Sequence, residues 1–304
     1  MCVITFGMGA CTENNVSIDL DEYLKGNEGF VTDKNDSVNR DTVNAAQKVD
    51  SIVSLALEVG FQGQKTFAMS DFTVSGEGIT PYPKGCYLHI YIYKAGHYPG
   101  FGQPVGFGVY HAYADGYVSS VYTPPSITPG YYNLYAVGVR NFASDKTPSF
   151  SSLTGYAFDL YNDLDYVWWK MENVHITKKN NAIKIFFSHE CVKIKLNFEV
   201  SSGHTLNALT HVDINMGNPN DCIFDLATGD IMAAFSNAYS QQMLTLDGTS
   251  AEGYMLPFTT FESRRCMVNA TVDGINKWYS LSIEVPRNYK FQAGNFYIYK
   301  VILE

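Results

Sequence analysis

The side chains able to perform chemistry are scattered along this chain without the spacing of a metal site. The seven histidines are His89, His97, His111, His175, His189, His204 and His211. No two of them are four residues apart, the spacing that places two metal ligands on one face of a helix. We interpret them as ordinary surface or packed residues.

The carboxylates fall into small clusters that could act as acid and base or bind calcium. The clusters are Asp19, Asp21 and Glu22; Asp159, Asp163 and Asp165; and Asp213 and Asp221 with Asn215 and Asn218. None has a convergent partner or a bidentate glutamate at a defined distance, so solvated acids are the favoured interpretation. No HExxH, GxSxG, phosphate-binding loop or EF-hand motif occurs. The sequence predicts no catalytic residue, no metal site and no cofactor.

Six cysteines are present, and none forms a CxxC pair. Four are widely spaced: Cys86, Cys191, Cys222 and Cys266. They are typical of buried small hydrophobic residues, although spacing leaves a Cys222–Cys266 disulfide open.

The N-terminus indicates export. Residues 1–10 are apolar and uncharged, like the end of a signal peptide. Gly9 and Ala10 precede Cys11, and a polar stretch follows. This arrangement predicts a lipoprotein signal with lipidation at Cys11; the alternative is a first core strand that carries a cysteine.

Composition favours strands and excludes one class of partner. Only 17% of the 304 residues are charged, whereas 22 are tyrosine and 19 are phenylalanine. Aromatic residues fit the surface of a sheet. The net charge of -9 argues against nucleic acid, which binds basic surfaces. The sequence contains no apolar stretch of about 20 residues, so it predicts no transmembrane helix.

Alternating residues recur along the chain and predict many short strands. Val16, Ile18 and Leu20 share one face of a first strand, and residues 25–48 follow as a polar loop. Residues 192–200 form the clearest amphipathic strand, and one short helix is expected over 229–238. We predict an all-β chain with two antiparallel β-sandwich domains of transthyretin- or immunoglobulin-like type. The expected ranges are 1–10 for the signal remnant, 11–173 for the first domain and 174–304 for the second.

Tyrosines on the strands have two interpretations. Tyr87, Tyr91 and Tyr93 share a strand face, and Tyr131, Tyr132 and Tyr135 lie on another segment. Such rings could bind glycans because they offer a large flat area. Coverage of sheet faces and of the domain junction is the favoured alternative.

Several segments, in this order, resemble the fimbrillin-like family of bacterial surface lipoproteins, also called type V pilins. Residues 183–189 (IKIFFSH) and 191–198 (CVKIKLNF) resemble its strand ending in F-x-H and the alternating strand after it. Residues 291–302 (FQAGNFYIYKVI) are similar to its closing strand. Residues 128–136 (TPGYYNLYA) are similar to the corresponding strand of the first half.

The resemblance implies an exported, non-enzymatic fimbrial subunit or adhesin on the outer membrane, assembling with other pilin subunits by β-strand donation. In polymerising members an arginine-specific protease removes the first strand, and a neighbouring subunit fills the groove. Arg40 is the only arginine before Arg140 and lies in the polar loop, so it is the expected cleavage site. Cleavage would displace the strand of Val16, Ile18 and Leu20; alternatively, that strand stays in place. The sequence ends at the closing strand, which favours a tip, anchor or accessory role over a stalk role.

Three functions compete at this stage. The first is the fimbrial subunit or adhesin, with host or bacterial surface glycans or proteins as ligands. The second is a stand-alone surface carbohydrate-binding lipoprotein that uses the tyrosine faces. The third is a hydrolase on a β-sandwich, which would require convergent acids or a metal site.

Overall fold

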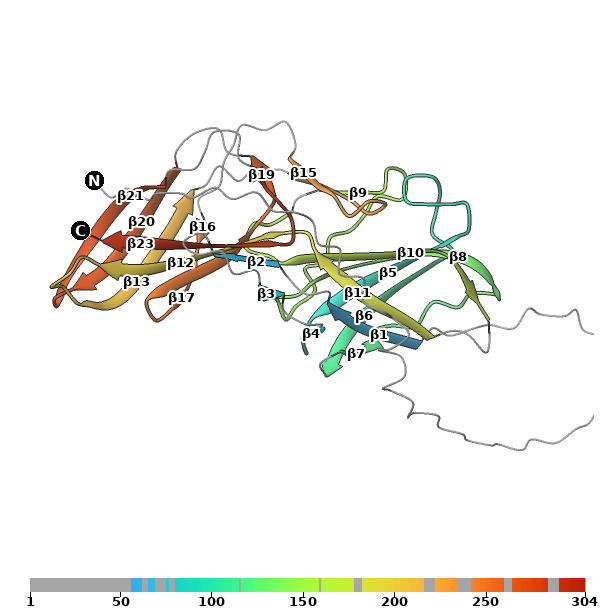
Figure 1. The fold of residues 1–304 in the computed structure, drawn as a ribbon. Helices are drawn as coiled ribbons and strands as arrows, with labels where there is room; N and C mark the ends of the chain where they lie inside the picture. Colours follow the sequence, from blue (N-terminus) through green and yellow to red (C-terminus); the bar gives the residue numbers. More distant parts are fainter. Residues whose placement is uncertain are drawn as a thin grey trace, which may run out of the picture. The chain divides into compact units, whose positions relative to one another are not determined.

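The computed structural model describes residues 56–61, 65–68, 75–76, 80–114, 116–158, 160–177, 182–215, 222–233, 242–259, 264–283 and 290–303. Within these ranges every regular element is a β-strand (Figure 1). The expectation of an all-β chain is confirmed for this part of the chain. None of the described residues forms a helix that is long and apolar enough to cross a membrane.

The largest sheet has eight strands in the order β11-β10-β8-β5-β6-β7-β1-β4. Their bounds are β1 Ala56–Phe61, β4 Thr80–Pro81, β5 Tyr87–Lys94, β6 Gly106–Ala114, β7 Tyr117–Ser120, β8 Gly130–Val139, β10 Tyr166–Ile176 and β11 Ala182–His189. Strand β1 also pairs with β11, in parallel, from Ala56↔Ala182 to Phe61↔Phe187. Because parallel neighbours cannot be joined by a tight hairpin, this pairing connects distant parts of the sequence.

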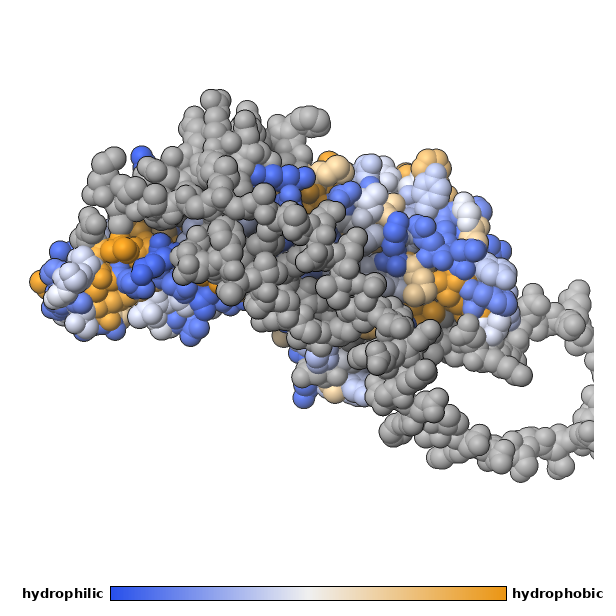
Figure 2. Space-filling model, viewed as in Figure 1, coloured by the Kyte–Doolittle hydropathy of each residue, from blue (hydrophilic) through white to orange (hydrophobic). Residues whose placement is uncertain are grey.

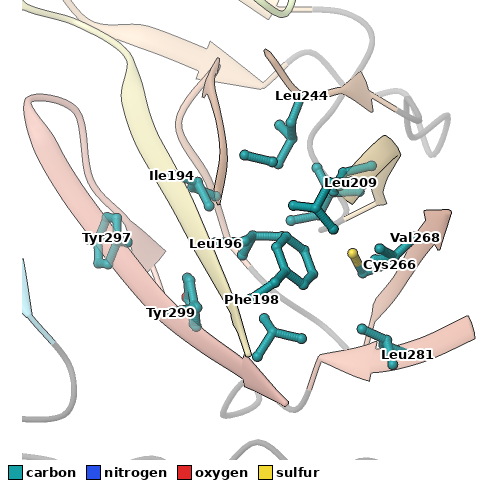
Figure 3. Close-up of a cluster of buried hydrophobic side chains, with 14 of the residues drawn as sticks. Ile194, Leu196, Phe198, Leu209, Leu244, Cys266, Val268, Leu281, Tyr297 and Tyr299 are labelled. Atoms are coloured by element: carbon teal, nitrogen blue, oxygen red, sulfur yellow. The ribbon is translucent and has the colours of Figure 1, made fainter. Parts of the chain in front are cut away.

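Two further sheets share one hydrophobic core. A six-stranded sheet has the order β17-β18-β12-β23-β2-β3, and a four-stranded sheet has the order β16-β13-β20-β21. Their bounds are β2 Lys65–Ala68, β3 Ser75–Gly76, β12 Val192–Val200, β13 Leu206–Asn215, β16 Gln242–Met243, β17 Thr245–Asp247, β18 Ser250–Met255, β20 Arg264–Val272, β21 Ile275–Ile283 and β23 Asn295–Leu303. Leu196 and Phe198 point from β12 toward Leu209 and Cys266 of the other sheet (Figure 3).

Strand β12 forms as its sequence predicts. Val192, Ile194, Leu196 and Phe198 are buried, at most 3% exposed, while the lysines between them face away from the core. Burying each such apolar side chain contributes roughly 1.5–3 kcal/mol. The strand pairs antiparallel with β18 and parallel with β23, so it lies inside its sheet.

Strand β5 is buried on both faces. Leu88, Ile90 and Ile92 belong to one core cluster, while Tyr91 and Tyr93 belong to another. The second cluster also contains side chains from the segment between β8 and β10 and from β14. The tyrosines therefore cover a sheet face, as the favoured interpretation expected.

The remaining strands form two small sheets, and one of them corrects an expectation. Strands β9 Tyr156–Ala157, β14 Cys222–Asp225 and β15 Ile231–Ala233 make one sheet; β19 Phe258–Thr259 and β22 Lys290–Phe291 make the other. The prediction of a helix over residues 229–238 is wrong for Ile231–Ala233, which form strand β15. Gly229 adopts a left-handed φ of 83° and its N–H donates to the Asp225 carbonyl, which reverses the chain. Ile231 then pairs with Phe224 of β14.

The division into two β-sandwich domains with a boundary near residue 173 stays a prediction. Strand pairing adds one fact about this region. Strand β11 lies in the range expected for the second domain, 174–304, and it pairs with β10 of the eight-stranded sheet, as in Val167↔His189. Glu190 and Cys191 alone connect β11 to β12 of the six-stranded sheet.

Candidate functional site

The residues predicted for export and maturation lie outside the described residues. They are Cys11, Arg40, Val16, Ile18 and Leu20. Lipidation at Cys11, cleavage at Arg40 and displacement of the first strand therefore remain predictions.

The closing strand β23 is a central strand of its sheet, where it lies between β12 and β2 (Figure 1). It pairs with β12 from Lys193↔Phe296 to Val200↔Leu303. Tyr297, Tyr299, Val301 and Leu303 alternate with less buried residues and are at most 3% exposed. The alternation that a donor strand needs is present, but these side chains already fill the core of their own chain. Releasing β23 would open that core.

Strands β1 and β2 precede the other described strands in the sequence, and each pairs into one of the two largest sheets. Strand β1 pairs with β11 and touches β7 through one pair, Glu58↔Tyr117. Strand β2 pairs in parallel with β23 from Lys65↔Asn295 to Ala68↔Ile298. Both strands follow Arg40 in the sequence, so cleavage at Arg40 would leave these pairings in the mature chain.

The connection between β11 and β12 is fixed to the start of β10. The Glu190 N–H donates to the Tyr166 carbonyl at 2.9 Å. The Cys191 thiol donates to the Leu164 carbonyl at 3.1 Å and accepts the Tyr166 N–H at 3.4 Å. His189 Nδ1 lies 2.9 Å from Asp165 Oδ1, and both side chains are almost fully buried. This junction is therefore a polar cluster inside an apolar surrounding.

The carboxyl of Glu190 in this junction has a raised pKa. Burial, together with the nearby carboxylates of Asp230 and Asp165, raises its pKa from 4.5 to about 7, although a hydrogen bond from Ser188 opposes the shift. Ser188 Oγ lies 2.5 Å from Glu190 Oε1 and 3.0 Å from the Trp168 carbonyl. A hydroxyl has one hydrogen, so Ser188 cannot donate to both. Ser188 donates to Glu190 when the carboxyl is ionised; when Glu190 is protonated it can donate to Ser188 Oγ, and the Ser188 hydrogen is then available to the Trp168 carbonyl.

Four histidines lie against aspartates, a pattern that sequence reasoning missed. The pairs are His89–Asp145, His189–Asp165, His204–Asp273 and His211–Asp213. The His189–Asp165 pair is too buried to meet a substrate. Among the described residues there is no group of three histidines, cysteines or acids that could hold a metal ion.

The cysteines in the described ranges are buried and form no disulfide with one another: Cys86, Cys191, Cys222 and Cys266. This agrees with the interpretation as small core residues, and the Cys222–Cys266 bridge does not form in this structure. Burial raises the pKa of Cys266 to about 12 and that of Cys191 well above its ordinary value. The reactive thiolate is therefore disfavoured at both.

Of the tyrosines proposed as a glycan platform, Tyr131 is 54% exposed and stacks on His175, whereas four others are buried. Tyr91, Tyr93, Tyr132 and Tyr135 are at most 7% exposed, so a glycan cannot stack on them. Trp278 of β21, which no sequence pattern singled out, is 59% exposed. Apolar residues gather in separate surface patches, one of them where Figure 1 places β13, β20 and β21 (Figure 2).

Comparison with solved structures supports the fold. A candidate cell adhesion protein of Bacteroides uniformis has a TM-score of 0.55 and 16% identity, covering 83% of this chain and 94% of its own. A candidate cell adhesion protein of Bacteroides fragilis has a TM-score of 0.54 and 13% identity, covering 83% and 93%. At these identities the likeness concerns the fold alone.

Comparison with sequences gives the family. No curated protein matches the chain. The family model described as fimbrillin-like matches residues 130–304, which is more than half of the chain. This match agrees with the resemblance seen in the motifs, and with the expectation of a non-enzymatic surface protein of the adhesion and fimbrial type. The chain therefore belongs to the fimbrillin-like family.

Proposed function

We propose that this protein is a tip, anchor or accessory subunit of a surface fimbrium, exported as a lipoprotein through Cys11 and assembled by β-strand donation. The observation that carries the proposal is the fimbrillin-like match over residues 130–304. Two acyl chains on Cys11 would attach the precursor stably to the outer membrane, and cleavage after Arg40 would release the chain from this anchor. Its partners are other pilin subunits, and its ligands are surface glycans or proteins.

The position of β23 supports an acceptor role. A donor must release a strand, and β23 is held by strands on both sides with four side chains in the core. In an acceptor, cleavage after Arg40 removes the strand of Val16, Ile18 and Leu20. That loss exposes backbone hydrogen-bonding groups and apolar pockets for a donated strand.

The test uses the full chain and an arginine-specific protease. We expect a new N-terminus at Asp41 and a product that binds a pilin subunit carrying a free donor strand, measured by size-exclusion chromatography. Arg40→Lys is the matched control, because it keeps the charge and removes the cleavage site. The control should stay uncut and should bind no subunit.

Two results would count against the acceptor role. In the first, the folded chain resists cleavage at Arg40. In the second, the protease cuts after Arg40 and the product gains no ability to bind the subunit.

A further inference from the structure

The outward face of β13, β16, β20 and β21 presents the exposed indole of Trp278 among polar side chains and two methionines, Met243 and Met267. Trp278, 59% exposed, lies in one cross-strand row with Asn269 and His211, through the pairs Asn269↔Trp278 and His211↔Asn269. The next row contains Met243, Asp213, Met267 and Ser280, and Met243 is 67% exposed. Opposite residues on one sheet face have Cβ atoms roughly 4.5–5.5 Å apart, so the two rows span about the size of a disaccharide.

The base of this face is fixed by hydrogen bonds. Asn269 is only 8% exposed and exchanges amide hydrogen bonds with Asn276 at 3.1 and 2.8 Å. The Thr210 hydroxyl donates to the Asn269 side chain from the other side. A buried amide satisfied in this way holds its strands in register, so the face is ordered before any ligand arrives.

The rings above this base are held as well. The His211 ring meets the Trp278 indole edge-on, with centroids 5.3 Å apart. His211 Nε2 lies 2.5 Å from Asp213 Oδ2. An indole with few remaining rotamers loses little entropy when a ligand stacks on it. The His211–Asp213 pair places a carboxylate acceptor next to an imidazole.

We propose that this face binds a neutral carbohydrate, with the indole of Trp278 stacked on the C–H face of a pyranose ring. Asp213 and His211 contact hydroxyl groups at one side of the ring, and Asn276 contacts them at the other. This inference rests on the proposed adhesive function and names its ligand class.

Charge and hydrogen bonding select this ligand over the alternatives. An anionic sugar or a phosphate would meet the Asp213 carboxylate, which repels it, although Arg265 lies on the same outward face one row further along. An apolar peptide could contact Met243 and Met267 on this face, but it would displace the water around His211, Asp213 and Asn276 and offer them few hydrogen bonds in return. A neutral sugar offers one apolar face for stacking and hydroxyl groups that both donate and accept.

Affinity at one such site should be low, roughly 0.1–10 mM, because one stacked ring and a few exposed hydrogen bonds are gained. An adhesin overcomes this weakness by multivalent contact with a surface that carries many glycans. The site should therefore be measured on a multivalent probe.

The test applies the purified full chain to beads that carry β-galactose, α-mannose, β-glucose or sialic acid. Retention on at least one neutral sugar is expected, with competition by the free methyl glycoside. Trp278→Ala should weaken retention at least roughly tenfold, because it removes the stacking ring, and Trp278→Phe should keep part of it. Tyr122→Ala is the matched control, because Tyr122 is an exposed ring, 72% exposed, that follows β7. It should bind like the unchanged chain.

The outcomes separate this site from the assembly mechanism. Failure of the unchanged chain to bind any neutral sugar overturns the proposal, as does retention on sialic acid alone or retention that Trp278→Ala leaves unchanged. The same Trp278→Ala chain should still be cut after Arg40 and accept a strand. If Trp278→Ala loses sugar binding but assembles normally, the proposal is supported. If the unchanged chain assembles normally but binds no neutral sugar, the proposal is wrong and the fimbrial role stands.

Discussion

Replacement of Glu190 by glutamine should change how the stability of the folded chain depends on pH. The carboxyl titrates at about 7 in the folded chain and near 4.5 when unfolded. The folded state therefore keeps its proton to higher pH. The stability that this group contributes is fully present below pH 4.5 and is lost as the pH rises through 7. At 1.36 kcal/mol per pH unit, the loss approaches about 3 kcal/mol, of which about 2–3 kcal/mol falls between pH 5 and pH 8.

Urea denaturation at pH 5 and pH 8 measures this effect. Glutamine cannot ionise. The free energy of unfolding of Glu190→Gln minus that of the unchanged chain should therefore be about 2–3 kcal/mol larger at pH 8 than at pH 5. Glu199→Gln is the control, because Glu199 is an exposed carboxyl that pairs with Lys300. It should change stability by less than about 1 kcal/mol at either pH. Equal pH dependence of the unchanged chain and Glu190→Gln would refute a protonated Glu190 at the junction.

Two further pairs of substitutions test the packing. Leu196→Ala should lower the free energy of unfolding by about 2–5 kcal/mol, because Leu196 is fully buried; Ile302→Ala, at a side chain that is 41% exposed, should cost less than about 1 kcal/mol. Gly229→Ala should destabilise by at least about 2 kcal/mol, because a Cβ there would lie 2.5 Å from the Trp168 ring at a φ of +83°. Gly248→Ala, at a φ of +60° with open space around it, should cost only about 1 kcal/mol. Thermal denaturation measures all four, and equal effects within either pair would contradict the packing described above.

Local patterns predicted the strands well, because alternation is written into neighbouring residues. Residues 192–200 alternate strictly, and β12 has these bounds. The pattern over 229–238 misled because a few apolar residues fit a helix face and a strand equally well. The left-handed conformation of Gly229 reverses the chain, and the pairing of Ile231 with Phe224 makes β14 and β15 a hairpin.

Contacts between distant residues were beyond the sequence patterns. His189 and Asp165 are 24 residues apart, and His204 and Asp273 are 69 apart, so neither pair has a spacing signature. The parallel pairing of β1 with β11 is equally non-local. Trp278 carries no signal of its own, because its exposure depends on how β20 and β21 pair.

The location of the native chain on cells that produce it tests the central claim most directly. Intact cells are labelled with a reagent that does not cross membranes, filaments are sheared and purified, and the chain is identified in each fraction by mass spectrometry. A surface fimbrial subunit should be labelled on intact cells and should be recovered with the filaments. A chain that is absent from both the labelled and the filament fractions, and present only inside the cells, would contradict the proposed role.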